Sequence, residues 1–242
     1  MHLSGLLTLQ LIAHLMADFF FQTDRLAKEK NQLGFQCPFL KWHALIVFLL
    51  SWILSFQLTF AGGALIIAIT HFLMDGFKKY LNQSKLFGKY AFFIDQGFHF
   101  LVIILVVFFF GRYFEIQSIL PLRLPIKGLL IILAFLICLK PANIFIKEVF
   151  RAFEIPVPDN DDLPNAGKLI GVLERVLVLT FILLGQFQAV GFLIAAKSIL
   201  RYKNDDTLKT EYVLIGTMLS FGIALLAAVL LSLERLVGLY FV

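Results

Sequence analysis

Residues 93–111, FIDQGFHFLVIILVVFFFG, hold one aspartate and one histidine at the start of an otherwise apolar run. A helix needs about 20 mostly apolar residues to cross the hydrocarbon core of a membrane. Because lipid offers the backbone no hydrogen-bond partners, such a run is predicted to be helical. Ionisable side chains are costly inside a membrane and usually serve a function there. The stretch therefore predicts a transmembrane helix with a functional site near one end.

The composition of the whole chain indicates the same class of protein. Hydrophobic residues make up 60% of the 242 residues, and only 15% are charged. The net charge of +5 is interpreted as Lys and Arg in cytoplasmic loops, and no nucleic-acid partner is expected. The two cysteines, Cys37 and Cys138, predict neither a disulfide framework nor a thiolate zinc site.

Apolar segments recur along the chain and predict an all-α, polytopic transmembrane bundle with about eight membrane segments. The predicted segments are 5–22, 42–60, 62–77, 93–111, 126–142, 168–185, 188–202 and 210–233. The first has no basic n-region or clear cleavage site, so it is interpreted as a retained span. Basic residues concentrate in alternate loops, including 24–41 and 78–92. The positive-inside rule then places these loops in the cytoplasm and both termini outside.

Three parts follow along the sequence. Residues 1–142 are predicted to form an N-terminal transmembrane bundle. Residues 143–166 are predicted to contain an amphipathic segment at the membrane surface followed by an acidic loop. Residues 167–242 are predicted to form a three-helix transmembrane part.

Histidine–aspartate pairs spaced by four residues occur three times in the N-terminal part. The pairs are His14 and Asp18, His71 and Asp75, and Asp95 and His99, and His43 stands near the start of another apolar run. Residues four apart lie on the same face of a helix. The predicted topology places all seven side chains near the cytoplasmic ends of their helices, so a shared site is expected.

Imidazole and carboxylate groups are ordinary metal ligands. We expect His14, Asp18, His43, His71, Asp75, Asp95 and His99 to supply the ligands of one or two divalent ions. Zinc is the first candidate, with manganese or iron as alternatives. Asp18, Asp75 and Asp95 are also candidates for a catalytic general base acting on metal-activated water. A proton relay and a purely structural polar network remain alternatives.

Other polar residues are candidates for binding an anionic group. These are Lys78, Arg175, Lys197 and Arg201. Lys78 can equally be an ordinary cytoplasmic anchor, and a salt-bridge network that includes Glu174 is favoured for the other three. Gln22 and Gln96 are interpreted first as helix-end or interface residues, with hydrogen bonding to the site as the alternative.

These residues belong to a longer pattern. It reads His14-x-x-x-Asp18-Phe-Phe-Phe-Gln22-Thr23-Asp24, His43, His71-x-x-x-Asp75-x-x-Lys78 and Asp95-Gln96-x-x-His99. Together with the run 167–175, this pattern resembles a bacterial membrane family, the domain-of-unknown-function family 3307. The resemblance implies a bacterial inner-membrane protein. The His/Asp spacing alone is also similar to that of membrane-bound metal-dependent hydrolases and zinc phospholipase C-like enzymes.

The sequence thus predicts a metal-dependent hydrolase that acts on a phosphoester or lipid-like anionic substrate at the cytoplasmic face. Membrane lipid and a small anionic or lipid-like molecule are the expected partners, and a homo-oligomer is left open. The alternative is a proton- or metal-ion-coupled transporter that uses the same cluster. The nearly apolar outer halves of the first four segments argue against that alternative. A third reading is a regulatory or assembly protein that the cluster merely holds together.

Overall fold

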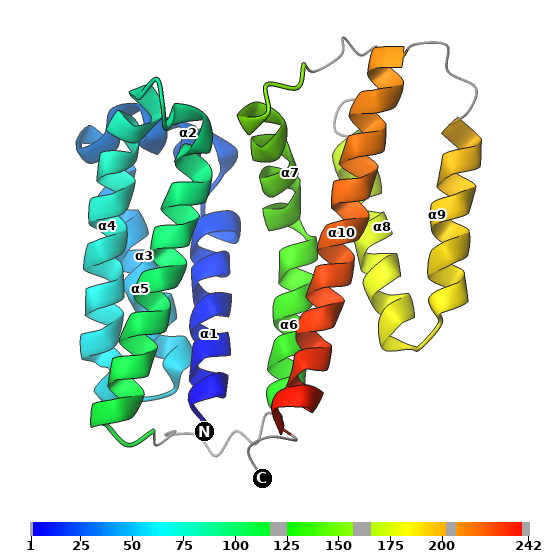
Figure 1. The fold of residues 1–242 in the computed structure, drawn as a ribbon. Coiled ribbons are helices and arrows are strands. Elements are labelled where there is room, and N and C mark those ends of the chain that lie inside the picture. The colour runs from blue at the N-terminus through cyan, green and yellow to red at the C-terminus, as the bar shows by residue number, and fades with distance from the viewer. Residues whose placement is uncertain (1, 117–124, 157–165, 202–206, 239–242) are drawn as a thin grey trace. The chain divides into compact units, whose positions relative to one another are not determined.

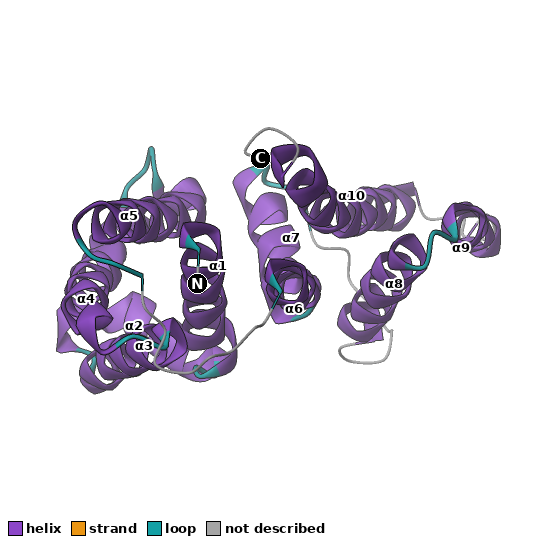
Figure 2. Cartoon of the chain, turned by 90° about the horizontal axis from the view of Figure 1, so that it is seen from below, coloured by secondary structure: helices purple, strands orange, loops and turns teal. Residues whose placement is uncertain are grey.

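A computed structural model describes residues 2–116, 125–156, 166–201 and 207–238, with the side chains of 200–209 and 232–238 left undescribed. Every regular element in these ranges is a helix, which confirms the all-α prediction (Figures 1 and 2). The chain forms two compact units, Met1–Leu129 and Leu130–Val242. Each unit is described by itself.

The first unit is a ring of four long helices. They are α1 (Leu3–Leu15), α3 (Pro38–Ser55), α4 (Ala61–Gln83) and α5 (Ala91–Tyr113). Helix α1 packs on α3, α3 on α4, α4 on α5, and α5 back on α1. Figure 2 looks along the axis of this ring. The arrangement directs one face of every helix toward a common interior.

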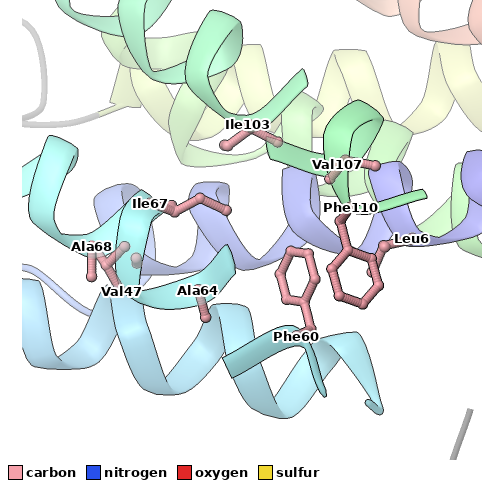
Figure 3. Close-up of a cluster of buried hydrophobic side chains, with 10 residues drawn as sticks. Leu6, Val47, Phe60, Ala64, Ile67, Ala68, Ile103, Val107 and Phe110 are labelled. Carbon is pink, nitrogen blue, oxygen red and sulfur yellow. The ribbon is translucent and has the colours of Figure 1, made fainter. Parts of the chain in front are cut away.

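Apolar side chains fill most of that interior. Leu6, Phe60 and Phe110 are buried at one end of the cluster shown in Figure 3. The two phenylalanine rings pack edge to face there, with 4.9 Å between their centroids. The outward faces are also apolar, as Trp42 and Phe108 illustrate with 65% and 57% exposure. Such a surface suits lipid better than water. The apolar outward faces of these helices therefore support the assignment to a membrane.

A short helix, α2 (Asp24–Leu33), connects α1 to α3 in the sequence and lies across the end of this bundle, where it packs mainly on α4 (Figure 1). Thr23 begins it by accepting a hydrogen bond from the Leu26 amide. Gly34 follows it with φ of +58°, a conformation that favours glycine. A Cβ on Gly34 would lie 2.8 Å from the carbonyl oxygen of Gly76. The turn thus presses the end of α2 against α4. The loop interpretation of this stretch was therefore incomplete.

The second unit contains α6 (Ile126–Cys138, whose first turn belongs to the first unit), α7 (Lys140–Ala152), α8 (Ala166–Leu183), α9 (Phe187–Arg201) and α10 (Thr207–Gly238). Its core gathers Cys138, Val178, Leu179, Phe221 and Ala224. Helices α6 and α7 meet at an angle of 47°. Pro141 stands at the first turn of α7, where its missing N–H ends the continuous helix.

The predicted count of eight membrane segments is not reached. Within the described residues, five helices are long and apolar enough to cross a membrane, and the bent α6–α7 pair would make a sixth. Helix α8 carries three charged residues, Lys168, Glu174 and Arg175, and α9 has only 15 residues. These two helices miss the criteria for a span through their charge and their length, which a hydropathy pattern alone does not weigh. Helix α7 covers the predicted amphipathic segment and begins three residues earlier than expected, and its place at the membrane surface stays a prediction. The acidic loop falls among residues 157–165, outside the described residues.

Candidate metal centre

The seven predicted ligands lie together at the end of the first unit that α2 covers. Their elements are α1 for His14, the π-helical turn Met16–Phe20 for Asp18, α3 for His43, α4 for His71 and Asp75, and α5 for Asp95 and His99. All seven are at most 7% exposed. Residues far apart in sequence therefore converge because neighbouring helices of the ring run in opposite directions.

Asp18 is positioned by a local widening of its helix. After Leu15 the backbone continues as a π-helix, a feature often found at functional sites. Gln22 Nε2 donates to the Asp18 carbonyl at 2.8 Å. The Asp18 carboxylate lies 3.0 Å from His71 and 3.2 Å from His43, but 3.9 Å from His14. The spacing of four residues therefore does not give Asp18 its closest partner.

Two imidazole nitrogens and two carboxylates face one another at the centre of the cluster. His43 Nε2 lies 3.1 Å from His71 Nε2. Asp18 Oδ1 completes a triangle with them, at 3.2 and 3.0 Å. Asp75 Oδ2 forms a second triangle with the same two nitrogens, at 3.5 Å from His43 Nε2 and 3.4 Å from His71 Nε2. Ligands at 2.0–2.1 Å around a tetrahedral zinc ion are about 3.3 Å apart, so both triangles have the size of one face of such a site.

Asp95 and His99 form the other end of the cluster. Asp95 Oδ1 lies 3.3 Å from His99 Nε2. The His99 ring stacks on the His71 ring with 3.9 Å between centroids. Three overlapping groups have ligand atoms that all lie within 4.8 Å of one another: His14, Asp18 and His71; His43, His71 and Asp75; and Asp75, Asp95 and His99. The stacked rings connect the second and third groups.

Two lysines supply positive charge to the cluster. Lys30 Nζ lies 2.6 Å from Asp75 Oδ2, and both side chains are at most 3% exposed. Lys78 Nζ lies 2.5 Å from Asp95 Oδ2. With the four imidazoles neutral, three carboxylates and two ammonium groups leave one negative charge in a buried site. Buried charge is costly unless it is compensated, so the cluster favours a cation or an additional proton.

Sequence reasoning missed Lys30 and underestimated Gln96. Gln96 Oε1 accepts from His14 Nε2 at 3.1 Å, and Gln96 Nε2 donates to Asp18 Oδ2 at 3.1 Å and to Asp95 Oδ2 at 3.2 Å. It therefore joins both ends of the cluster. Lys30 could have been suspected from the helix signals around it, with Thr23 as N-cap and Gly34 after the last turn. The inward direction of the Lys30 side chain, however, depends on how α2 packs.

The remaining cationic candidates lie in the second unit. The Arg175 guanidinium is buried and donates to the Cys138 carbonyl at 2.7 Å, to Ser220 at 2.9 Å and to Asn143 at 2.6 Å. Lys197 Nζ lies 2.5 Å from Glu174. The Arg201 side chain falls outside the described residues. The role of these three in binding an anion stays a prediction.

Comparison with known proteins supports the family resemblance. Residues 6–123 match the model of a family described as "Protein of unknown function (DUF3307)". The matched range contains every member of the His/Asp cluster together with Lys30 and Lys78. Searches of curated proteins and of solved structures found no match.

Proposed function

We propose that the first unit is a membrane-embedded divalent-metal centre that hydrolyses a phosphoester or a related anionic, lipid-like substrate. The observation that carries the proposal is the convergence of His43, His71, Asp18 and Asp75, with donor atoms 3.0–3.5 Å apart. Three donors at this spacing fit one face of a tetrahedral ion of the size of zinc, which leaves the fourth position for water. Manganese and iron also accept imidazole and carboxylate ligands.

A metal ion at this position would bring the chemistry of hydrolysis. A bound divalent ion lowers the pKa of water toward about 7 and polarises a phosphoryl oxygen. A carboxylate that is not occupied by the metal can take the proton from the attacking water. Asp18, Asp75 and Asp95 all lie within the cluster, and whichever of them the metal leaves free is the candidate for that role.

Two lysines favour an anionic substrate. Lys78 is the more accessible of the two, with 12% of its side chain exposed. Lys30 approaches from α2, which lies across the same end of the bundle. Ammonium groups are point charges that suit phosphate oxygens. They would neutralise a phosphoryl group beside the metal, and lipid headgroups are one source of such a group.

The proposed location is a bacterial inner membrane, with the metal centre at the cytoplasmic face and both termini outside. The apolar exterior of α3, α4 and α5 supports the membrane, and the basic loops support the orientation.

Elemental analysis of detergent-purified protein is the test. The wild-type chain is expected to carry a stoichiometric divalent metal, and the double variant His71→Gln with Asp75→Asn to carry none. Hydrolysis of a chromogenic phosphoester should stop after chelation and return with the metal. A wild-type protein without metal after growth in metal-supplemented medium would overturn the proposal.

Ion transport is a second candidate, favoured by buried polar residues beyond the cluster. Gln10 and Ser51 exchange hydrogen bonds in the other half of the bundle, with Gln10 Nε2 donating to the Ser51 carbonyl at 3.0 Å. Gln57 is 1% exposed, and its side-chain amide has no partner among the described residues. These residues qualify the expectation that the outer half is apolar. Proton or metal-ion flux in liposomes, with no phosphoester turnover, would favour this function.

A further inference from the structure

Asp95 and His99 present two buried polar atoms that lie within ion-pair distance of each other and make no hydrogen bond in the described part of the chain. Asp95 Oδ1 and His99 Nε2 lie 3.3 Å apart, yet neither makes a hydrogen bond to any described residue. Buried polar atoms in native proteins are nearly always satisfied. Two such atoms side by side point to a shared ligand that both would bind.

The neighbouring contacts leave these two atoms available. Lys78 and Gln96 both bind the other carboxylate oxygen of Asp95, Oδ2, at 2.5 and 3.2 Å. Oδ1 is thereby turned toward His99. A water molecule could satisfy one hydrogen bond to each atom, but an imidazole nitrogen and a carboxylate oxygen at this separation also match two ligands of one metal ion.

A third ligand is present in Asp75. Asp75, Asp95 and His99 offer donor atoms that all lie within 4.8 Å of one another. Asp75 Oδ2 also lies 3.4 Å from His71, which belongs to the first metal position. One carboxylate therefore stands between two groups of ligands, as a bridging ligand does in a two-metal site.

We infer that Asp75, Asp95 and His99 hold a second divalent metal ion, which makes the centre dinuclear with Asp75 as the bridge. The inference rests on the proposed function, since it adds a second ion to the same centre. The His71 and His99 rings stack with 3.9 Å between their centroids, and each ring would ligate one ion.

The charge of the loaded centre indicates the substrate class. The three carboxylates and two lysines carry one net negative charge, so two divalent ions would make the centre strongly positive. A metal-bound hydroxide and a phosphate group would offset that charge. A phosphomonoester, with two negative charges, fits this centre better than a neutral ester.

Metal stoichiometry tests the second position. Full-length protein in detergent would be stripped with a chelator, reloaded with zinc and desalted before elemental analysis. The wild type is expected to retain two zinc ions per chain, and Asp95→Asn and His99→Gln one each. His2→Gln, which changes an exposed histidine at the start of α1, is the matched control and should retain two.

Manganese supplies a second readout that needs no variant. Wild-type protein loaded with Mn²⁺ should give the electron paramagnetic resonance spectrum of two exchange-coupled ions, since a bridging carboxylate couples them. A single retained ion with an uncoupled spectrum, unchanged by Asp95→Asn, would overturn the second position and leave the proposed function standing. No retained ion would overturn both.

Discussion

Removing the Lys30 ammonium should destabilise the metal-free protein and make its stability depend on metal. Lys30 and Asp75 form an ion pair of 2.6 Å between side chains that are 3% and 2% exposed. Removing one partner of a buried ion pair typically costs about 3–5 kcal/mol, because the other charge stays buried without compensation. For a protein of this size, a loss of 1 kcal/mol in the free energy of unfolding lowers the unfolding midpoint by about 2–4 °C. Lys30→Met should therefore lower the unfolding midpoint in chelator by about 6–20 °C.

A thermal unfolding assay in detergent measures this effect, with chelator in one arm and zinc in the other. Lys28→Met is the matched control, since Lys28 is exposed on the same helix, and surface substitutions usually change stability by less than about 0.5 kcal/mol. Zinc beside Asp75 replaces the missing charge, so it should raise the midpoint of Lys30→Met more than that of Lys28→Met. Equal midpoints for the two variants in chelator, or equal responses to zinc, would refute the reasoning.

Three further substitutions give separate outcomes. Gln96→Leu removes the amide that joins His14, Asp18 and Asp95, and should weaken zinc binding about 10–100-fold in competition with a chelating dye; unchanged affinity would contradict its positioning role. Gly34→Ala adds a Cβ at a positive φ and 2.8 Å from a backbone oxygen. The free energy of unfolding should therefore fall by about 1–3 kcal/mol, and an unchanged unfolding midpoint would contradict the close packing of α2. Arg175→Met deletes the three hydrogen bonds of the buried Arg175 guanidinium in the second unit. It should lower the free energy of unfolding by about 2–5 kcal/mol while metal content stays the same, and a loss of metal would show that the units depend on each other.

The clustering of histidine and aspartate was predictable from sequence because it rests on two simple regularities. Residues four apart share a helical face, and charge in the loops orients the helices. Those rules place His71 with Asp75 and Asp95 with His99 at the same end of neighbouring helices. The structure brings the same residues together, with 3.4 and 3.3 Å between the members of these pairs.

The details that sequence did not reveal depend on packing. The π-helical turn redirects Asp18 away from His14 and toward His43 and His71, and no spacing rule foresees such a turn. Lys30 sits in a short polar helix that resembles an ordinary basic loop. Its inward direction follows only when the close approach of Gly34 to α4 is known.

The number of membrane segments shows a different limit of prediction from sequence. Helices α8 and α9 have apolar sequences, but Glu174 and Arg175 find their partners inside the second unit. A hydropathy window counts such residues only as a loss of apolar character and does not show whether they have partners inside the fold. Within the described residues, length, hydropathy and charge together reduce the number of candidate spans.

Anomalous diffraction at the zinc absorption edge tests the central claim most directly. Crystals of the full-length protein grown with zinc should show an anomalous peak between His43 Nε2 and His71 Nε2, about 2.0–2.1 Å from each. His71→Gln with Asp75→Asn should remove that peak. A zinc-loaded crystal without an anomalous peak at these residues, with both imidazoles still hydrogen-bonded to Asp18, would contradict the metal centre.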